Sequence, residues 1–306
     1  MSPRLAFHVG PHKTGSTSVQ EALDAHRDRL VAGGVLYPAS LPGADHATSH
    51  AALTRLLATG QEAAFLDWVA DAMRDAGRQG CDTVLVSSEG FSSPRSWPSL
   101  RRIVRRLRRR TECRFVYVAR DLQAVTYSMM VQRLHNQAGF LHPLNHDLRA
   151  WAREFACLKD REERFFRRLG ATVLGLEAIP RNELAARVLA AACGRDFPDI
   201  PTGDVGRSAA KFAGTPKGLL SYALRVMEVI AHGGAMASTH THLAAAALIR
   251  ACELDPDGFA ALQRDFETAA RRQIAAGIAD HRRAGWWSDA SDRLRRASRI
   301  LFPSLS

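Results

Sequence analysis

The feature that most constrains the fold is a glycine loop between an apolar strand and an amphipathic helix. The stretch "RLAFHVGPHKTGSTSVQEAL" (4–23) gives a strand first, then a loop that contains Gly10 and Gly15, and then a helix. A strand that ends in a tight glycine turn and leads into a helix directs backbone N–H groups and the positive end of the helix dipole at one point. The sequence therefore predicts an anion-binding loop within a βαβ unit.

The loop departs at one residue from the pattern that binds nucleoside triphosphates. That pattern, G-x-x-x-x-G-K-[ST], has its lysine directly after the second glycine, where it reaches the outer phosphates. Here the lysine is Lys13, two places before Gly15, and Ser16 and Thr17 follow the glycine. We expect a phosphate-like ligand for which ATP is a poor fit. The structural alternative is that the glycines serve only the turn and that Ser16 caps the helix.

Apolar runs and helical patterns alternate through the first two thirds of the chain. Strands are expected at 4–9, 83–88, 114–120 and 171–177, and helices near 49–58, 61–76, 98–110, 123–137 and 147–168. The strands lack the apolar/polar alternation of a half-exposed sheet, so helices should cover both faces of a central parallel sheet.

The pattern changes after Asp196. A loop at 197–206 is followed by helical patterns at 216–232, 241–253, 257–283 and 288–301. We expect one α/β domain over 1–306, with a nucleotide-binding core at 1–195 and a mainly helical portion at 196–306.

Composition limits the class of protein. The chain is 46% hydrophobic and 24% charged, close to the average of globular proteins. Its longest apolar stretch, near 243–249, is far shorter than the roughly 20 residues of a spanning helix, and no signal peptide is recognisable. We therefore expect a cytoplasmic protein without an integral membrane segment. Five cysteines, an odd number without a C-x-x-C pair, favour reduced thiols over disulfides or a zinc site.

The loop "HVGPHKTGSTSVQ" resembles the 5′-phosphosulfate loop of sulfotransferases that use 3′-phosphoadenosine 5′-phosphosulfate (PAPS). In that family, the lysine two residues before the glycine stabilises the leaving phosphate. The resemblance implies that Lys13 is catalytic and that the donor is held by His12, Lys13, Thr14, Gly15, Ser16 and Thr17. Sulfuryl transfer builds negative charge on the leaving oxygen, and a lysine can meet that charge without a metal. We therefore expect no metal requirement.

A second stretch, "VYVARDLQAVTYSMMVQ", has an arginine where a strand ends, Arg120, and a serine eight residues later, Ser128. It resembles the family's 3′-phosphate motif, in which both residues bind the 3′-phosphate of PAPS and of the product adenosine 3′,5′-bisphosphate. The family often has proline where this chain has Leu122. The alternative is a surface arginine and a solvent-facing serine. A weaker resemblance, in "DVGRSAAKF" (204–212), implies further nucleotide contacts by Arg207, Ser208 and Lys211.

The acceptor needs a general base within reach of its proton. Glu89 is one candidate, because it follows a strand at the edge where open α/β sheets place ligands. His46 and His50 are the others, since their spacing of four residues would put them on one helix face. The alternatives are a turn cap for Glu89, and surface or metal-binding roles for the histidines.

The resemblance implies a sulfotransferase fold of the P-loop NTPase type. It also implies sulfuryl transfer from PAPS to a hydroxyl or amine of a carbohydrate or other small acceptor. A magnesium-dependent kinase is the first alternative, with Glu89 as the metal-holding carboxylate. A basic nucleic-acid-binding module is the second, suggested by the net charge of +11 and by "RRIVRRLRRR" (101–110). The chain shows no recognition motif or stacking platform, so we expect no nucleic-acid partner.

Overall fold

The computed structural model describes residues 3–41, 48–136, 148–197, 200–202 and 256–283. The chain forms two compact units, of which the first comprises Met1–Asp121 and Arg161–Gly206 and the second Leu122–Asp160 and Arg207–Ser306. The sequence pattern placed the start of the helical portion at residue 196, whereas residues 122–160 already group with the C-terminal part. That the whole chain acts as one domain stays a prediction.

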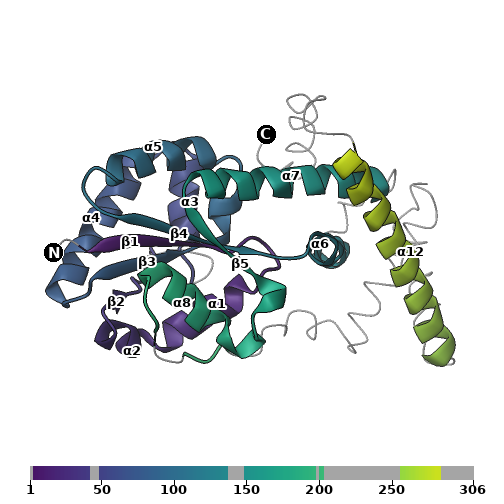
Figure 1. The fold of residues 1–306 in the computed structure, drawn as a ribbon, viewed down its shortest axis with the longest axis horizontal. Helices are drawn as coiled ribbons and strands as arrows, with labels where there is room; N and C mark the ends of the chain where they lie inside the picture. The colour runs from purple at the N-terminus through teal and green to yellow at the C-terminus, as the bar shows by residue number, and fades with distance from the viewer. Residues whose placement is uncertain (1–2, 42–47, 137–147, 198–199, 203–255, 284–306) are drawn as a thin grey trace, which may run out of the picture. The chain divides into compact units, whose positions relative to one another are not determined.

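The first unit is built on a five-stranded parallel sheet with the order β2-β3-β1-β4-β5 (Figure 1). The strands are β1 Arg4–Val9, β2 Val35–Leu36, β3 Thr83–Ser87, β4 Cys113–Ala119 and β5 Ala171–Gly175. In the central strand, His8 is in register with Ser87 on one side and with Val116 on the other. Because the strands are parallel, the carboxyl ends of β1, β3 and β4 lie at the same edge.

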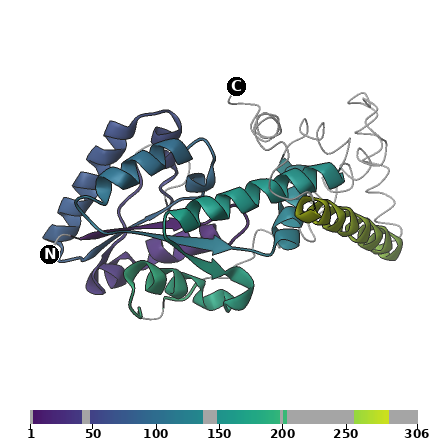
Figure 2. The ribbon, with the colours of Figure 1, turned by 45° about the horizontal axis from the view of Figure 1, so that its top comes forward.

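Helices cover both faces of the sheet, as expected from strands that are apolar on both sides (Figures 1 and 2). One face carries α3 Ala51–Ala58, α4 Glu62–Arg78 and α5 Trp97–Leu107, and the other carries α1 Ser16–Ala25, α2 Arg27–Ala32 and α8 Leu184–Cys193. Short 3-10 turns complete the unit: η1 Glu89–Ser92, η2 Leu176–Ala178 and η3 Arg181–Glu183. The expected α/β fold is confirmed.

Each face of the sheet has its own apolar core. On the side of α3, α4 and α5, the ring of Phe7 stacks on that of Phe115 at 4.8 Å and meets Phe91 edge-on at 5.5 Å. On the opposite side, Leu23 of α1 and Leu189 of α8 are fully buried in one cluster with the sheet. Residues of β1 pack into both cores, and this fixes the point at which the glycine loop leaves the sheet.

The second unit contains α6 Leu122–Asn136, the first part of α7 Leu148–Arg168, and α12 Pro256–Arg283. Its apolar core joins Val125, Trp151 and Ile274. α12 confirms the helix expected at 257–283, whereas those expected at 216–232, 241–253 and 288–301 lie outside the described residues. Within the described part of the chain, no helix has the length and apolar character needed to cross a membrane.

Three local features differ from the expectations. β2 was not predicted, because a two-residue strand is too short to give a pattern. α8 was also missed, since half of its buried stripe consists of small residues that give little periodic signal. The helix expected from residue 49 begins at Ala51, so His50 immediately precedes α3. His46, its expected partner on a helix face, lies outside the described residues.

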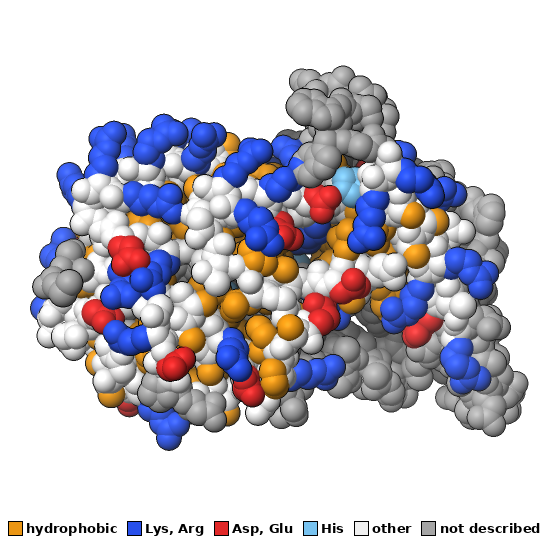
Figure 3. All heavy atoms as spheres, viewed as in Figure 1, with side chains coloured by type: hydrophobic (Ala, Val, Ile, Leu, Met, Phe, Trp, Pro, Cys, Tyr) orange, Lys and Arg blue, Asp and Glu red, His pale blue; other side chains and the backbone are white. Residues whose placement is uncertain are grey.

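The basic run at 101–110 folds as expected into an amphipathic helix. Leu100, Ile103 and Val104 of α5 are buried against the sheet, while the arginines of the run face outward. Figure 3 shows the corresponding gathering of Lys and Arg side chains at the upper left, over the region of α4 and α5.

Gly90, next to the candidate residue Glu89, tests how tightly η1 packs on α3. A Cβ at Gly90 would lie 2.1 Å from Thr54 Oγ1 and 2.8 Å from Thr54 Cβ. We expect Gly90→Ala to lower the free energy of unfolding by about 1–3 kcal/mol through overpacking. Urea unfolding followed by circular dichroism measures the change.

The matched control is Gly77, near the end of α4, where an added Cβ would meet nothing within 4 Å. Gly77→Ala should raise the free energy of unfolding by about 0.5–1 kcal/mol, because alanine favours a helix over glycine. A change of the same sign in the unfolding free energy of both variants would contradict the packing described for η1.

Candidate functional site

The glycine loop holds Lys13 in an uncommon backbone conformation. Lys13 has a φ of 68°, and among the described residues it is the only non-glycine residue with a positive φ. Gly15, which precedes α1, has a φ of 81°. Thr14 lies between these two residues and closes the turn that begins at Pro11. Its N–H and its hydroxyl both donate to the carbonyl of Pro11, at 3.2 and 2.6 Å. A positive φ is costly for a lysine and is typical of positions with a functional constraint.

Gly10 allows β1 and α1 to approach closely. A Cβ at this position would lie 2.5 Å from Ser16 Cβ and 3.2 Å from the ring of His8. Ser16, the first residue of α1, is buried beside it, while Thr17 is exposed. The N-terminus of α1 therefore stands directly over the end of the central strand, as an anion-binding loop requires.

Glu89 reaches the loop from the end of β3. The Ser16 hydroxyl donates to Glu89 Oε1, and His12 Nδ1 lies 2.5 Å from Glu89 Oε2. Burial alone would raise the pKa of Glu89. Hydrogen bonds from His12 and Ser16, together with the charge of Lys13, outweigh burial and lower this pKa. Glu89 is therefore an ionised carboxylate with both oxygens engaged.

Arg120, directly after β4, contacts the same loop. Its Nη1 donates to the carbonyl oxygen of Lys13 at 2.8 Å, a contact between residues 107 apart in sequence. Burial lowers the pKa of Lys13, the charge of Glu89 acts in the opposite sense, and Arg120 lowers it further. The structure thus brings together the two segments on which the sequence analysis depended. Ser128 lies on α6 in the second unit, so its pairing with Arg120 stays a prediction.

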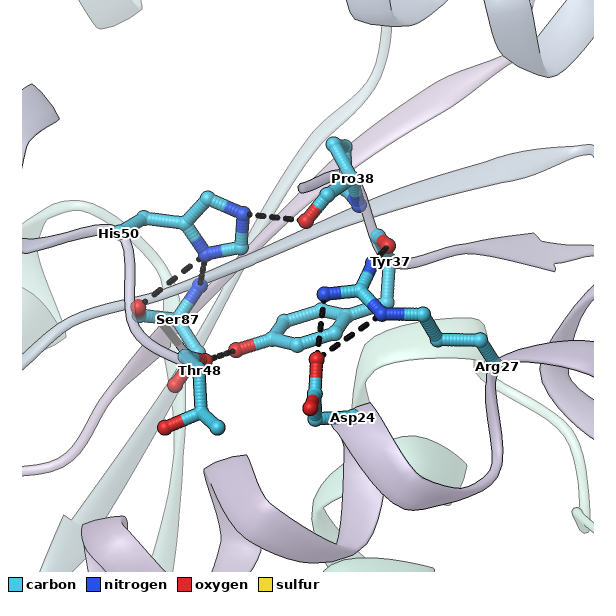
Figure 4. Close-up of polar contacts among 7 residues, drawn as sticks. All are labelled: Asp24, Arg27, Tyr37, Pro38, Thr48, His50 and Ser87. Atoms are coloured by element: carbon cyan, nitrogen blue, oxygen red, sulfur yellow. Dashed lines mark hydrogen bonds and ion pairs between the residues drawn. The ribbon is translucent and has the colours of Figure 1, made fainter. Parts of the chain in front are cut away.

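His50 is buried between the end of β3 and the segment that follows β2, in the polar cluster drawn in Figure 4. Its backbone N–H donates to the carbonyl of Ser87 at 2.9 Å, and its Nδ1 accepts from the N–H of Ser87 at 3.1 Å. Its Nε2 then carries the hydrogen and donates to the carbonyl of Pro38, at 3.1 Å. β2 pairs with β3 only at Thr83 and Val84, so His50 takes the place of a strand neighbour further along β3.

Both ring nitrogens of His50 are engaged, and we therefore leave this residue out of the proposed chemistry. The remaining candidates His46, Arg207, Ser208 and Lys211 lie outside the described residues.

His8 is a site residue that the sequence analysis missed. It lies fully buried on β1 under the loop, with Nδ1 2.8 Å from Ser87 Oγ, which also accepts from Gln20 Nε2 at 3.1 Å. Among the described residues, Nε2 of His8 has no partner. A histidine inside the apolar run "RLAFHV" was the available signal, since burying a polar ring needs a compensating contact.

Comparisons with known proteins returned no relative: no family model, no curated protein and no solved structure matches this chain.

The two buried histidines make stability depend on pH. Burial lowers the pKa of His50 to about 4, although its backbone hydrogen bonds act in the opposite sense, and lowers that of His8 to about 4 against the charge of Glu89. In the unfolded chain both titrate near 6.5. The unfolded state therefore binds more protons between pH 6.5 and 4, and stability falls as the pH falls through this window.

We expect each histidine to contribute a loss of about 3 kcal/mol on going from pH 6.5 to 4. Urea unfolding at a series of pH values measures this loss. His50→Gln and His8→Gln should each reduce the slope of unfolding free energy against pH by up to about 1.4 kcal/mol per unit, the contribution of one proton. An unchanged slope in both variants would show that these histidines are not held neutral.

Proposed function

We propose that the protein is a sulfotransferase that moves the sulfuryl group of PAPS to a hydroxyl or amine of a carbohydrate or other small acceptor. The observation that carries this proposal is the hydrogen bond from Arg120 to the Lys13 carbonyl. It joins the two segments that resemble the phosphosulfate and 3′-phosphate motifs of that family. PAPS carries a phosphosulfate at the 5′ position of its ribose and a phosphate at the 3′ position. A site for it needs cationic groups at two neighbouring points.

The charges of the site suit such a donor. The N-terminus of α1 offers backbone N–H groups and a positive dipole end to the phosphosulfate. Lys13 is half-buried, so its charge is less screened by water than that of a surface lysine and can stabilise the leaving phosphate oxygen. Arg120 donates one of its five N–H groups to the Lys13 carbonyl. A guanidinium suits a terminal phosphate, where Ser128 would add a hydroxyl.

A magnesium-dependent kinase is the second candidate, favoured by the contact between Ser16 and Glu89. A hydroxyl of the phosphate loop together with a carboxylate at a strand end is the pair that holds Mg²⁺ in P-loop enzymes. The position of Lys13 before Gly15 speaks for the sulfotransferase, because it departs from the lysine position of that pattern.

Ligand-dependent stabilisation separates the candidates. Adenosine 3′,5′-bisphosphate in the presence of EDTA should stabilise the protein, by about 2.7 kcal/mol at a hundredfold excess over its Kd. Adenosine 5′-phosphosulfate, which lacks the 3′-phosphate, should stabilise it less. Thermal unfolding measures both. Stabilisation by ATP with Mg²⁺ alone would support the kinase, and stabilisation only by an oligonucleotide would support a nucleic-acid-binding protein.

Lys13→Ala should impair the chemical step far more than donor binding, because the charge that Lys13 meets grows in the transition state. We expect single-turnover formation of the bisphosphate to fall by roughly 10²–10³-fold, the cost of losing one charge-stabilising donor. The acceptor is one found by screening carbohydrates and small alcohols with the wild type. Lys159→Ala, on α7, is the control. Equal rates in Lys13→Ala and the control would remove Lys13 from the mechanism.

A further inference from the structure

His12 of the glycine loop and Glu89 after β3 are in direct contact. We propose that His12 Nε2 takes the proton from the acceptor and that Glu89 positions the imidazole. This inference rests on the proposed sulfotransferase function and assigns its missing base. It starts from the contact of 2.5 Å between His12 Nδ1 and Glu89 Oε2.

The contact fixes which nitrogen of His12 can act as a base. Glu89 is ionised, and an ionised carboxylate can only accept hydrogen bonds. Nδ1 of His12 must therefore carry a hydrogen and donate it to Glu89. In the neutral imidazole the lone pair then lies on Nε2, the nitrogen that points away from the carboxylate.

Exposure distinguishes the histidine from the carboxylate as the group that meets an acceptor. The His12 side chain is 53% exposed, whereas that of Glu89 is 28% exposed. Glu89 has both oxygens engaged, by Ser16 and by His12. Among the described residues His12 Nε2 has no hydrogen-bond partner and belongs to a side chain that is more than half exposed, whereas both oxygens of the Glu89 carboxylate are engaged.

The same arrangement serves proton transfer in hydrolases, where a carboxylate holds a histidine in one tautomer and stabilises the imidazolium that forms. Here the acceptor O–H bond would break as its proton passes to His12 Nε2, and the acceptor oxygen would bond to sulfur. The bond between sulfur and the bridging oxygen breaks, and its electron pair stays on the phosphate beside Lys13. His12 and Lys13 are consecutive, so one loop positions both the base and the cation that stabilises the leaving phosphate.

His12→Gln tests the assignment, because glutamine can still donate to Glu89 but has no basic nitrogen. We expect kcat to fall by roughly 10²–10⁴-fold, the usual cost of losing a general base, with KM for PAPS nearly unchanged. Added imidazole should restore part of the rate, which a merely structural role of His12 would not predict. His26→Gln, a histidine substitution between α1 and α2 in the same unit, is the matched control.

Three results would overturn the assignment. One is His12→Gln with the rate of the control, which would return the base role to Glu89 or another group. The second is loss of stabilisation by the bisphosphate in His12→Gln, which would make His12 a donor-binding residue, the role that the resemblance to the phosphosulfate loop implies for it. The third is a ¹⁵N NMR spectrum of the wild type in which neutral His12 carries its hydrogen on Nε2.

Failure of the proposed function gives a different result. In that case the wild type itself neither gains stability from the bisphosphate nor consumes PAPS. A wild type that does both, with an active His12→Gln variant, leaves the sulfotransferase standing and removes only the His12–Glu89 pair.

Discussion

The parallel alignment of three strands is the constraint on which the rest of the site depends. β1 ends at Val9 beside Tyr117 of β4, and His8 is in register with Ser87 of β3. Because these strands run in the same direction, the loop after β1, Glu89 after β3 and Arg120 after β4 all leave the sheet at one edge. Residues that are 73 and 107 positions apart in the sequence thus come into contact at this edge.

The two cationic side chains at this edge each have a carboxylate nearby. Lys13 and Arg120 are both half-buried and repel one another, and burial alone lowers the pKa of each. Glu89 supplies the opposite charge to Lys13, while Glu177 does so for Arg120 at 3.9 Å. Lys13 and Arg120 still repel each other beside one loop. A doubly anionic ligand such as the proposed donor would reduce this repulsion.

Much of the fold could be predicted from the sequence, because the strands and the glycine loop give local signals. Phe7 and Phe115 lie in continuous apolar runs, and Gly10 and Gly15 mark a turn whatever surrounds them. The roles of His50 and His12 could not be predicted in the same way. The position of His50 depends on where β2 stops pairing with β3, and the contact of His12 with Glu89 depends on the register of β1 and β3. Strand pairing and register belong to the tertiary structure and cannot be predicted from the spacing of residues in the sequence.

The contact between His12 and Glu89 also bears on the choice between the two candidate chemistries. A carboxylate that holds Mg²⁺ needs its oxygens available to the metal or to its water ligands. In this site Glu89 receives the Ser16 hydroxyl on one oxygen and His12 Nδ1 on the other. Magnesium binding would require Glu89 to give up one or both of these bonds, including the one to a neighbouring histidine. The proposed proton transfer requires no such change, since His12 Nδ1 already donates to Glu89 and His12 Nε2 has no hydrogen-bond partner among the described residues. The geometry of the carboxylate therefore favours our proposal, in which Glu89 positions a histidine base, over a role in holding a metal ion.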